Sequence, residues 1–243
     1  AGKIDPERPA AGAVWADRGG SLAAKIAGIP AGDICVVVDG HDAMPAMVAE
    51  LVAGLRLRHY RFDKYKSRKK DDETQETLTV TLHVSDPAAT DAAIAARMPA
   101  VEGQLLARDL INTPANDLGP DAFDKAIRTF AAQHKMKLKA IVGDDLLKQN
   151  FPMIHAVGRA GHQPPRLMDL TWGRESDPRV TLVGKGITFD TGGLHIKPAV
   201  PMTLMKKDMG GAANILGLAH AIVDAKLKVR LRVLIPIAEN SIS

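Results

Sequence analysis

Cysteine is nearly absent from the sequence, which has Cys35 alone among 243 residues. One cysteine excludes a disulfide framework and any zinc site built from several thiolates. It lies in the apolar run of residues 34–38, where we expect it to be a small, buried side chain of a strand. A chain without disulfides is typical of a reducing compartment, so we expect a cytoplasmic protein.

Long hydrophobic runs, internal repeats and low-complexity tracts are also missing from the sequence. No apolar run reaches the ~18 residues that a membrane-spanning helix needs, and the amino terminus has no apolar signal core. We therefore expect no association with a membrane. The composition, 46% hydrophobic and 25% charged, is close to that of globular proteins and excludes a disordered chain.

The excess of positive charge is only +4, so nucleic acid is not an expected partner. One stretch is nonetheless rich in basic residues with aromatic residues between them: Arg56, Arg58, Arg61, Lys64, Lys66, Arg68, Lys69 and Lys70. Acidic residues follow within 71–76, and we interpret the stretch as a solvated helix end and loop with salt bridges. A non-catalytic role for it, in DNA binding or as a scaffold, is the alternative function.

Apolar periodicity predicts an α/β organisation in the first third of the chain. Residues 34–38 and 77–84 are predicted strands, and residues 44–54 a predicted helix. Apolar residues recur at helical spacing over 91–111, and Pro114 disfavours helix at the residue before it. We predict an amino-terminal α/β domain over residues 1–88, an interdomain helix over 89–112 and a second domain over 113–243.

The second domain is predicted to contain a sheet with helices between its strands. The expected helices are residues 120–133, 144–150 and 210–225, and the expected strands are 140–142, 155–158, 167–172, 180–183 and 229–237. The strand over 180–183 is expected to end in residues 184–186, and a glycine-rich loop is expected at residues 190–193. The order of strand, loop, helix and strand at the end of the chain is typical of a parallel sheet with helical crossovers.

In such sheets, ligands bind at the carboxyl ends of the strands. Lys185 and Asp190 are predicted to lie just past one such end, and Glu239 and Asn240 just past another. Phosphate-loop, dinucleotide-binding, serine-nucleophile and His-Glu-x-x-His motifs do not occur. Of the eight scattered histidines, His195 alone lies beside this polar segment, and we interpret it as a hydrogen-bonded residue at the edge of a site.

Four charged residues stand out in a segment that is otherwise poor in charge: Lys185, Asp190, Lys197 and Asp208. Asp208 precedes the helix predicted over 210–225, where a carboxylate is a favourable N-cap and the helix dipole keeps it ionised. On composition alone, an ordinary set of surface salt bridges is the stronger interpretation of these four residues.

The sequence around these residues reads VGKGITFDTGG at 183–193, IKP at 196–198 and MKKDMGGAA at 205–213, after NTPAN at 112–116 and YRFDKYK at 60–66. These segments resemble the leucyl aminopeptidases, the M17 family of dinuclear metallopeptidases. The resemblance extends over residues 55–243, and its Lys-x4-Asp-x6-Lys-x10-Asp spacing is highly specific. It implies that the second domain is the first part of a three-layer α/β/α catalytic domain, with a mixed, largely parallel sheet.

The resemblance also implies a role for each matching position. Lys185 would bind the tighter-held metal through its amine, Asp190 would bridge both metals, and Asp208 would be a carboxylate ligand of the tighter site. Lys197 would touch no metal but would polarise the scissile carbonyl of a bound peptide. Met205 would line the pocket for the first side chain of the substrate.

The implied cofactors are two divalent cations per site, Mn²⁺ or Zn²⁺, with Mg²⁺ and Co²⁺ as alternatives, because the ligands are oxygen and amine without thiolate. A lysine amine binds a metal only after it loses its proton, which burial and a neighbouring dication both favour. The implied reaction is the release of the first residue of a peptide, with a leucine-like preference, by water that the metals activate.

The family's second motif, NTDAEGR, is absent and would lie beyond Ser243. In the family it supplies two more metal ligands and an arginine that holds a bicarbonate ion. We therefore expect this chain to be the first part of a longer protein, with three of five ligand residues, and to be inactive alone. Its expected partners are peptide substrates, the remaining part of the same protein and further copies in a hexamer.

Overall fold

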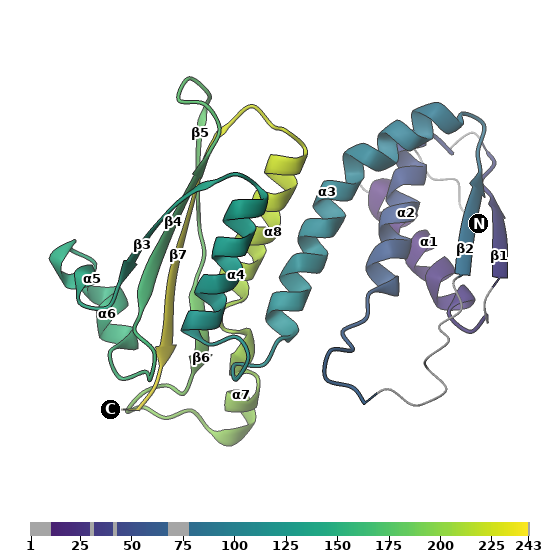
Figure 1. Ribbon diagram of the computed structural model, residues 1–243. Coiled ribbons are helices and arrows are strands. Elements are labelled where there is room, and N and C mark those ends of the chain that lie inside the picture. The colour runs from purple at the N-terminus through teal and green to yellow at the C-terminus, as the bar shows by residue number, and fades with distance from the viewer. Residues whose placement is uncertain (1–10, 30–31, 41–42, 68–77, 243) are drawn as a thin grey trace. The chain divides into compact units, whose positions relative to one another are not determined.

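The computed structural model describes residues 11–29, 32–40, 43–67 and 78–242. Contacts divide the chain into two compact units, Ala1–Val101 and Glu102–Ser243, and the division falls within α3 (Pro87–Asn112) (Figure 1). This helix confirms the long helix predicted over 91–111, while the domain boundaries predicted at residues 88 and 112 stay predictions. In the described ranges, no helix combines the length and the apolarity needed to cross a membrane.

The first unit contains α1 (Ala11–Ile26) and α2 (Pro45–His59), with β1 (Gly32–Val37) and β2 (Leu78–His83) paired in parallel. The sequence predicted the last three of these elements, although α2 continues to His59 and residue 77 of the second strand lies outside the described residues. It did not predict α1, since consecutive glycines at 19–20 weaken the helical signal there.

The expected burial of Cys35 is wrong, because its side chain is exposed. Successive residues of a strand point to opposite faces. Ile34 and Val36 are half-buried on one face of β1, whereas Cys35 shares the other face with Val37, which is 70% exposed. An apolar run therefore indicated the strand correctly but did not indicate which of its faces is covered.

The second unit is built on a five-stranded sheet formed by β3 (Lys137–Val142), β4 (Arg166–Trp172), β7 (Arg230–Asn240), β5 (Arg179–Val183) and β6 (Gly186–Asp190). β3, β4 and β7 are joined in antiparallel pairs, while β5 and β6 both pair with β7 in parallel. The sheet is mixed, as expected, but its described pairs are parallel and antiparallel in equal number rather than largely parallel.

Helices cover both faces of this sheet and produce three layers. α4 (Pro120–Gln133) and α8 (Gly210–Asp224) lie on one face, and the short α5 (Asp145–Lys148) and α6 (Pro152–Gly158) lie on the other (Figure 1). The main core forms between the sheet and the first pair of helices. The smaller cluster lies against the second pair.

The central strand shows how the sequence specifies the two faces. Leu231, Val233, Ile235 and Ile237 of β7 are fully buried in the main core, while Leu234 packs with the smaller cluster on the opposite face. This alternation follows from the two-residue period of a strand. A strand covered on both faces is apolar on both, which is why β7 reads as a nearly continuous apolar run.

Two predictions about the second unit are wrong. Residues 155–158, predicted as a strand, belong to α6, which Pro152 begins at a position where its fixed φ suits a helix. Residues 186–190, where no strand was predicted, form β6, and β7 extends to Asn240 rather than ending at residue 237. Asp190, Glu239 and Asn240 therefore lie at strand ends rather than beyond them. Short apolar runs do not distinguish a strand from a helix by periodicity.

Candidate metal centre

The candidate site lies where the parallel strands of the second unit end, as the sequence predicted. Lys185 lies between β5 and β6, and Asp190 is the last residue of β6, in register with Asn240 of β7. The backbone at Lys185 is held against α8, since its carbonyl accepts a hydrogen bond from Ala212 N–H at 2.9 Å. A Cβ at Gly184 would lie 2.8 Å from the Cα of Ala212, so this close approach requires glycine.

Asp208 faces Lys185 rather than the end of α8. The ammonium of Lys185 donates to Asp208 Oδ1 at 3.0 Å and lies 2.8 Å from Oδ2. The predicted N-cap role of Asp208 is wrong, because Met209 is the N-cap of α8 and no side chain caps it. Asp208 instead follows a 3-10 turn, η2 (Met205–Lys207), which turns its carboxylate toward Lys185.

Asp190 is held by three donors. Its Oδ1 accepts hydrogen bonds from Gly192 N–H at 2.9 Å and from the Asn240 amide at 2.6 Å, and its Oδ2 lies 3.1 Å from the Lys197 ammonium. Burial raises the pKa of Asp190, but these hydrogen bonds and the Lys197 charge outweigh it, so its pKa lies below the ordinary value. Asp190 is therefore a carboxylate at neutral pH, the form that binds a metal.

Lys197 reaches Asp190 because the intervening loop turns back on itself. Lys197 N–H donates to the Thr191 carbonyl at 2.8 Å, which closes the loop. Gly192 has φ of 92°, and a Cβ there would lie 2.3 Å from the His195 carbonyl oxygen, so the turn needs glycine at this position. The side chain of His195 is exposed in the same loop.

A cavity of about 390 Å³ opens beside these residues. Its polar lining comes from Lys185, Asp190 and Asn240, and its apolar lining includes Met153, Ile154 and Val157 of α6. The four charged residues thus form two linked pairs, Lys185 with Asp208 and Lys197 with Asp190, and one member of each pair lines the cavity. Met205 is half-buried in η2 and is not among the lining residues that the described structure gives.

The sequence did not reveal two parts of this site. The apolar wall comes from α6, the segment that was predicted as a strand. Asn240 was noted only for its place near a strand end, and its hydrogen bond to Asp190 joins residues fifty positions apart. The signal that could have found it is the register of β6 and β7, which brings the two residues side by side.

The residues present fit a divalent cation. They offer one amine and two carboxylates without any thiolate, a set that suits Zn²⁺, Mn²⁺, Mg²⁺ or Co²⁺. Asp208 Oδ2 is buried and, although close to the Lys185 nitrogen, accepts no hydrogen bond of favourable geometry. A buried carboxylate oxygen without a donor is what a metal ligand offers to an incoming cation.

The described part of the basic stretch contains an ion pair and contacts with aromatic rings. Lys66 forms an ion pair with Asp63, and Lys64 lies 5.2 Å from the ring centroid of Tyr65. The Phe62 and Tyr65 rings lie 5.9 Å apart and pack on each other. The basic residues at 68–70 lie outside the described residues. These contacts agree with a solvated loop, and none of them favours nucleic-acid binding.

Two family models match the chain. Residues 105–243 match the catalytic domain of the cytosol aminopeptidase family, and residues 13–69 match its N-terminal domain. A probable cytosol aminopeptidase of Xanthobacter autotrophicus is 39% identical over 227 residues, which are 89% of this chain and 46% of that protein. The chain therefore spans about half the length of the curated relatives it matches.

Solved structures give the same result. The crystal structure of a cytosol aminopeptidase from Coxiella burnetii is 40% identical with a TM-score of 0.77, over 94% of this chain and 46% of that one. The bottromycin maturation enzyme BotP in complex with Mn is 33% identical with a TM-score of 0.80, over 94% of this chain and 49% of that one. The structural comparison and the sequence comparison thus identify the same group of relatives.

Proposed function

This chain belongs to the cytosol aminopeptidase family, and from that membership we propose that the whole protein removes the first residue of peptides. The observation that carries the proposal is the contact of Lys185 Nζ with the carboxylate of Asp208, 2.8 Å apart across twenty-three positions of sequence. Lys185, Asp190 and Asp208 are the residues to which the family resemblance assigns metal binding, and the contact between Lys185 and Asp208 supports that assignment.

Two divalent cations per site form part of the proposal. When bound, they would supply an activated water nucleophile and an anchor for the free amine of the peptide. Lys185, Asp190 and Asp208 are the ligands that this chain would contribute. A solved relative, BotP, is described as a complex with Mn, which supports Mn²⁺ as one of the metals, with Zn²⁺ as the other candidate.

Lys185 would act as a ligand in its neutral form. Its side chain is 58% exposed. Removal of its proton would therefore depend on the charge of the arriving cation more than on an apolar environment. Asp208 and Asp190 need no such change, since both are carboxylates already turned toward lysine side chains.

Lys197 would act on the peptide rather than on the metal. As an ammonium held 3.1 Å from Asp190 Oδ2, it has a fixed position beside the bridging ligand. There it would stabilise the negative charge that develops on the carbonyl oxygen, an effect of about 3 kcal/mol in comparable sites. The apolar wall of the cavity, from Met153 to Val157, suits a leucine-like side chain, while the substrate-binding role of Met205 stays a prediction.

The metal content of an Asp190→Ala variant of the whole protein tests the ligand assignment. We expect the variant to lose bound metal after loading with Mn²⁺ and gel filtration, because the bridging carboxylate is gone. Asp145→Ala, which removes an exposed carboxylate of α5, is the matched control and should keep its metal. Equal metal content in Asp190→Ala and the parent protein would remove Asp190 from the ligands.

Lys197→Ala tests the role on the peptide. We expect unchanged metal content and a kcat about 10²- to 10³-fold lower for an aminoacyl-anilide, because an oxyanion donor is lost. Lys207→Ala removes an exposed lysine ten positions later in the chain and should leave kcat unchanged. An undiminished kcat in Lys197→Ala would contradict the proposed role.

A hexamer of copies, a cytosolic location and a bicarbonate ion in the complete site also belong to this proposal. The names of the relatives support the location. The three ligand residues of this chain support only part of the site, since the resemblance implies two further ligands and an arginine for bicarbonate from the remainder of the protein.

A further inference from the structure

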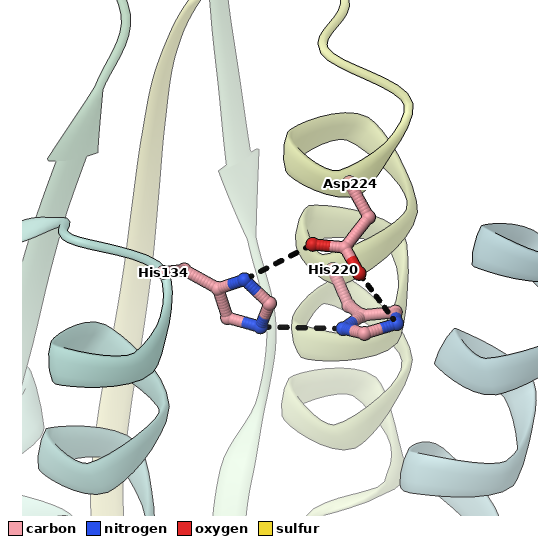
Figure 2. A group of neighbouring side chains, drawn as sticks. All are labelled: His134, His220 and Asp224. Carbon is pink, nitrogen blue, oxygen red and sulfur yellow. Dashed lines mark hydrogen bonds and ion pairs between the residues drawn. The ribbon is translucent and has the colours of Figure 1, made fainter.

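A second group of potential metal ligands lies in the second unit, at the far end of α8. His134 directly follows α4, while His220 and Asp224 are four positions apart in the last turn of α8 and so share one helix face. Figure 2 shows the two imidazoles and the carboxylate turned toward one another. One ligand atom from each residue can be chosen so that all three lie within 4.8 Å of one another.

Each two of these three residues approach each other closely, through a different pair of atoms in each case. His134 Nε2 lies 3.2 Å from His220 Nδ1, His134 Nδ1 lies 3.3 Å from Asp224 Oδ1, and His220 Nε2 lies 3.5 Å from Asp224 Oδ2. Ligand atoms at 2.0–2.1 Å from a tetrahedral Zn²⁺ lie about 3.3 to 3.4 Å from one another. The three observed distances involve both ring nitrogens of each histidine and both oxygens of Asp224, whereas one atom chosen from each residue leaves all three within 4.8 Å of one another. Side-chain rotations that shorten these separations by up to about 1.4 Å would bring one atom of each residue to bonding distance.

The protons of two neutral imidazoles do not satisfy every nitrogen and oxygen in the group of His134, His220 and Asp224. If His134 donates from Nδ1 to Asp224, its Nε2 accepts from His220 Nδ1–H, and His220 Nε2 is left with a lone pair. That nitrogen is buried without a hydrogen bond and faces two carboxylates, those of Asp224 and Glu102, each 3.5 Å away. A lone pair against two anions is unfavourable unless a proton or a metal ion lies between them.

Both imidazoles of the group are largely shielded from solvent. The side chains of His134 and His220 are only 12% and 17% exposed. Neutral imidazole is the form that binds metal ions.

The surrounding structure holds the ligands in place. The ring of His134 packs on Phe130 at 4.4 Å between centroids, and its backbone N–H donates to the Phe130 carbonyl. The next residue, Lys135, has φ of 53° and ends α4. Ala219 and Ile222 of α8 are in the main core. A site supported in this way needs little ordering when a metal binds.

The group is separate from the candidate metal centre. Asp208 lies beside the start of α8, at Gly210, whereas His220 is ten positions further along the helix. A helix rises 1.5 Å per residue, so about 15 Å of α8 separates the two. The two imidazoles and one carboxylate also differ in chemistry from the lysine and carboxylates of the first site.

We propose that His134, His220 and Asp224 bind one Zn²⁺ ion, which ties the end of α4 to the end of α8. Glu102, whose carboxylate already approaches His220 Nε2, completes a four-coordinate site. Zn²⁺ is the expected metal because imidazole and carboxylate ligands bind it more tightly than Mn²⁺. The site is structural, and it stabilises the face of the catalytic unit away from the strand ends.

Zinc binding to the whole protein tests this site. We expect Zn²⁺ titration to show one fewer bound ion per chain in His220→Gln than in the parent protein. The double variant Asp190→Ala/His220→Gln should likewise bind one ion fewer than Asp190→Ala. The second comparison keeps this result independent of the first metal centre. Co²⁺ alone should give the visible absorption of a tetrahedral ion in Asp190→Ala, and this absorption should disappear on adding His220→Gln.

Two further variants control for folding. Asp224→Asn keeps an acceptor for His134 but is a poor ligand, and it should weaken Zn²⁺ binding by at least about tenfold while circular dichroism stays unchanged. His155→Gln removes the histidine of a two-residue pair with Asp144, 3.2 Å apart, and should bind Zn²⁺ as the parent does. Equal Zn²⁺ stoichiometry and affinity in the parent, His220→Gln and Asp224→Asn would overturn the proposal.

Discussion

A single guanidinium group, that of Arg166, joins the first residues of α4 to the sheet of the second unit. It donates to Asp124 Oδ2 at 2.9 Å and to the Pro164 carbonyl, and it also pairs with Asp121. The Arg166 and Asp124 side chains are only 6% and 9% exposed. Charges buried to this extent are tolerated only when they are paired and hydrogen-bonded.

Arg166→Met is therefore expected to destabilise the protein by about 3 kcal/mol or more, because it leaves Asp124 buried with one partner fewer. The measurement is the free energy of unfolding from urea titration. Arg232→Met is the matched control, since Arg232 pairs bidentately with Asp169 but is 52% exposed, and its loss should cost about 1 kcal/mol or less. Similar losses in both variants would contradict the assigned importance of burial.

The identity and spacing of the four charged residues could be read from the sequence without the structure. Lys185, Asp190, Lys197 and Asp208 lie within twenty-four consecutive positions, so their spacing could be read directly from the chain. The structure pairs them as Lys185 with Asp208 and Lys197 with Asp190. That pairing was not predictable, because it depends on how the loop after β6 turns back at Gly192.

At the scale of elements, the packing of α1 on α2 depends on glycine. A Cβ on Gly19 would lie 1.8 Å from the Leu51 carbonyl oxygen, and one on Gly54 would lie 1.8 Å from that of Ala16. The two helices thus touch through their backbones. Gly20, the next residue, has no such constraint, because its Cβ would meet atoms no closer than 3.9 Å.

Gly19→Ala should therefore destabilise the first unit by about 2 kcal/mol or more, because the helices must separate to accept the methyl group. Gly20→Ala should instead be neutral or stabilise by up to about 1 kcal/mol, because alanine is the better helix former. Thermal unfolding followed by circular dichroism measures both. A Gly19→Ala variant as stable as Gly20→Ala would show that α1 and α2 do not pack this closely.

The elements that the sequence predicted well are long and strongly patterned. α4 and α8 carry apolar residues at helical spacing, and both begin where predicted, at Pro120 and Gly210. Apart from α1, whose glycines weakened its helical pattern, the missed elements include α6 and β6, which are seven and five residues long. In segments so short, neighbouring elements decide the conformation, as β7 does for β6 by pairing with it.

At the scale of the whole molecule, the chain offers three of the five ligand residues that the family resemblance implies. We expect a polypeptide of these 243 residues, supplied with Mn²⁺, to release no leucine from an aminoacyl-anilide, while the whole protein does. The physical reason is that the looser metal would keep only the bridging Asp190, and one carboxylate holds a dication weakly. Circular dichroism establishes that the polypeptide is folded, and robust turnover by it alone would contradict the expectation.

The sequence by itself determined the family, the α/β class and the four charged residues of the candidate metal centre, because the motifs that identify them lie in one nearly continuous segment. Only the tertiary structure decided which residues from distant segments come into contact. Asn240 reaches Asp190 through strand pairing, and His134 meets His220 across eighty-six positions of sequence. The reason is that side-chain contacts between remote segments depend on strand register and helix packing, and local sequence patterns specify neither of these directly.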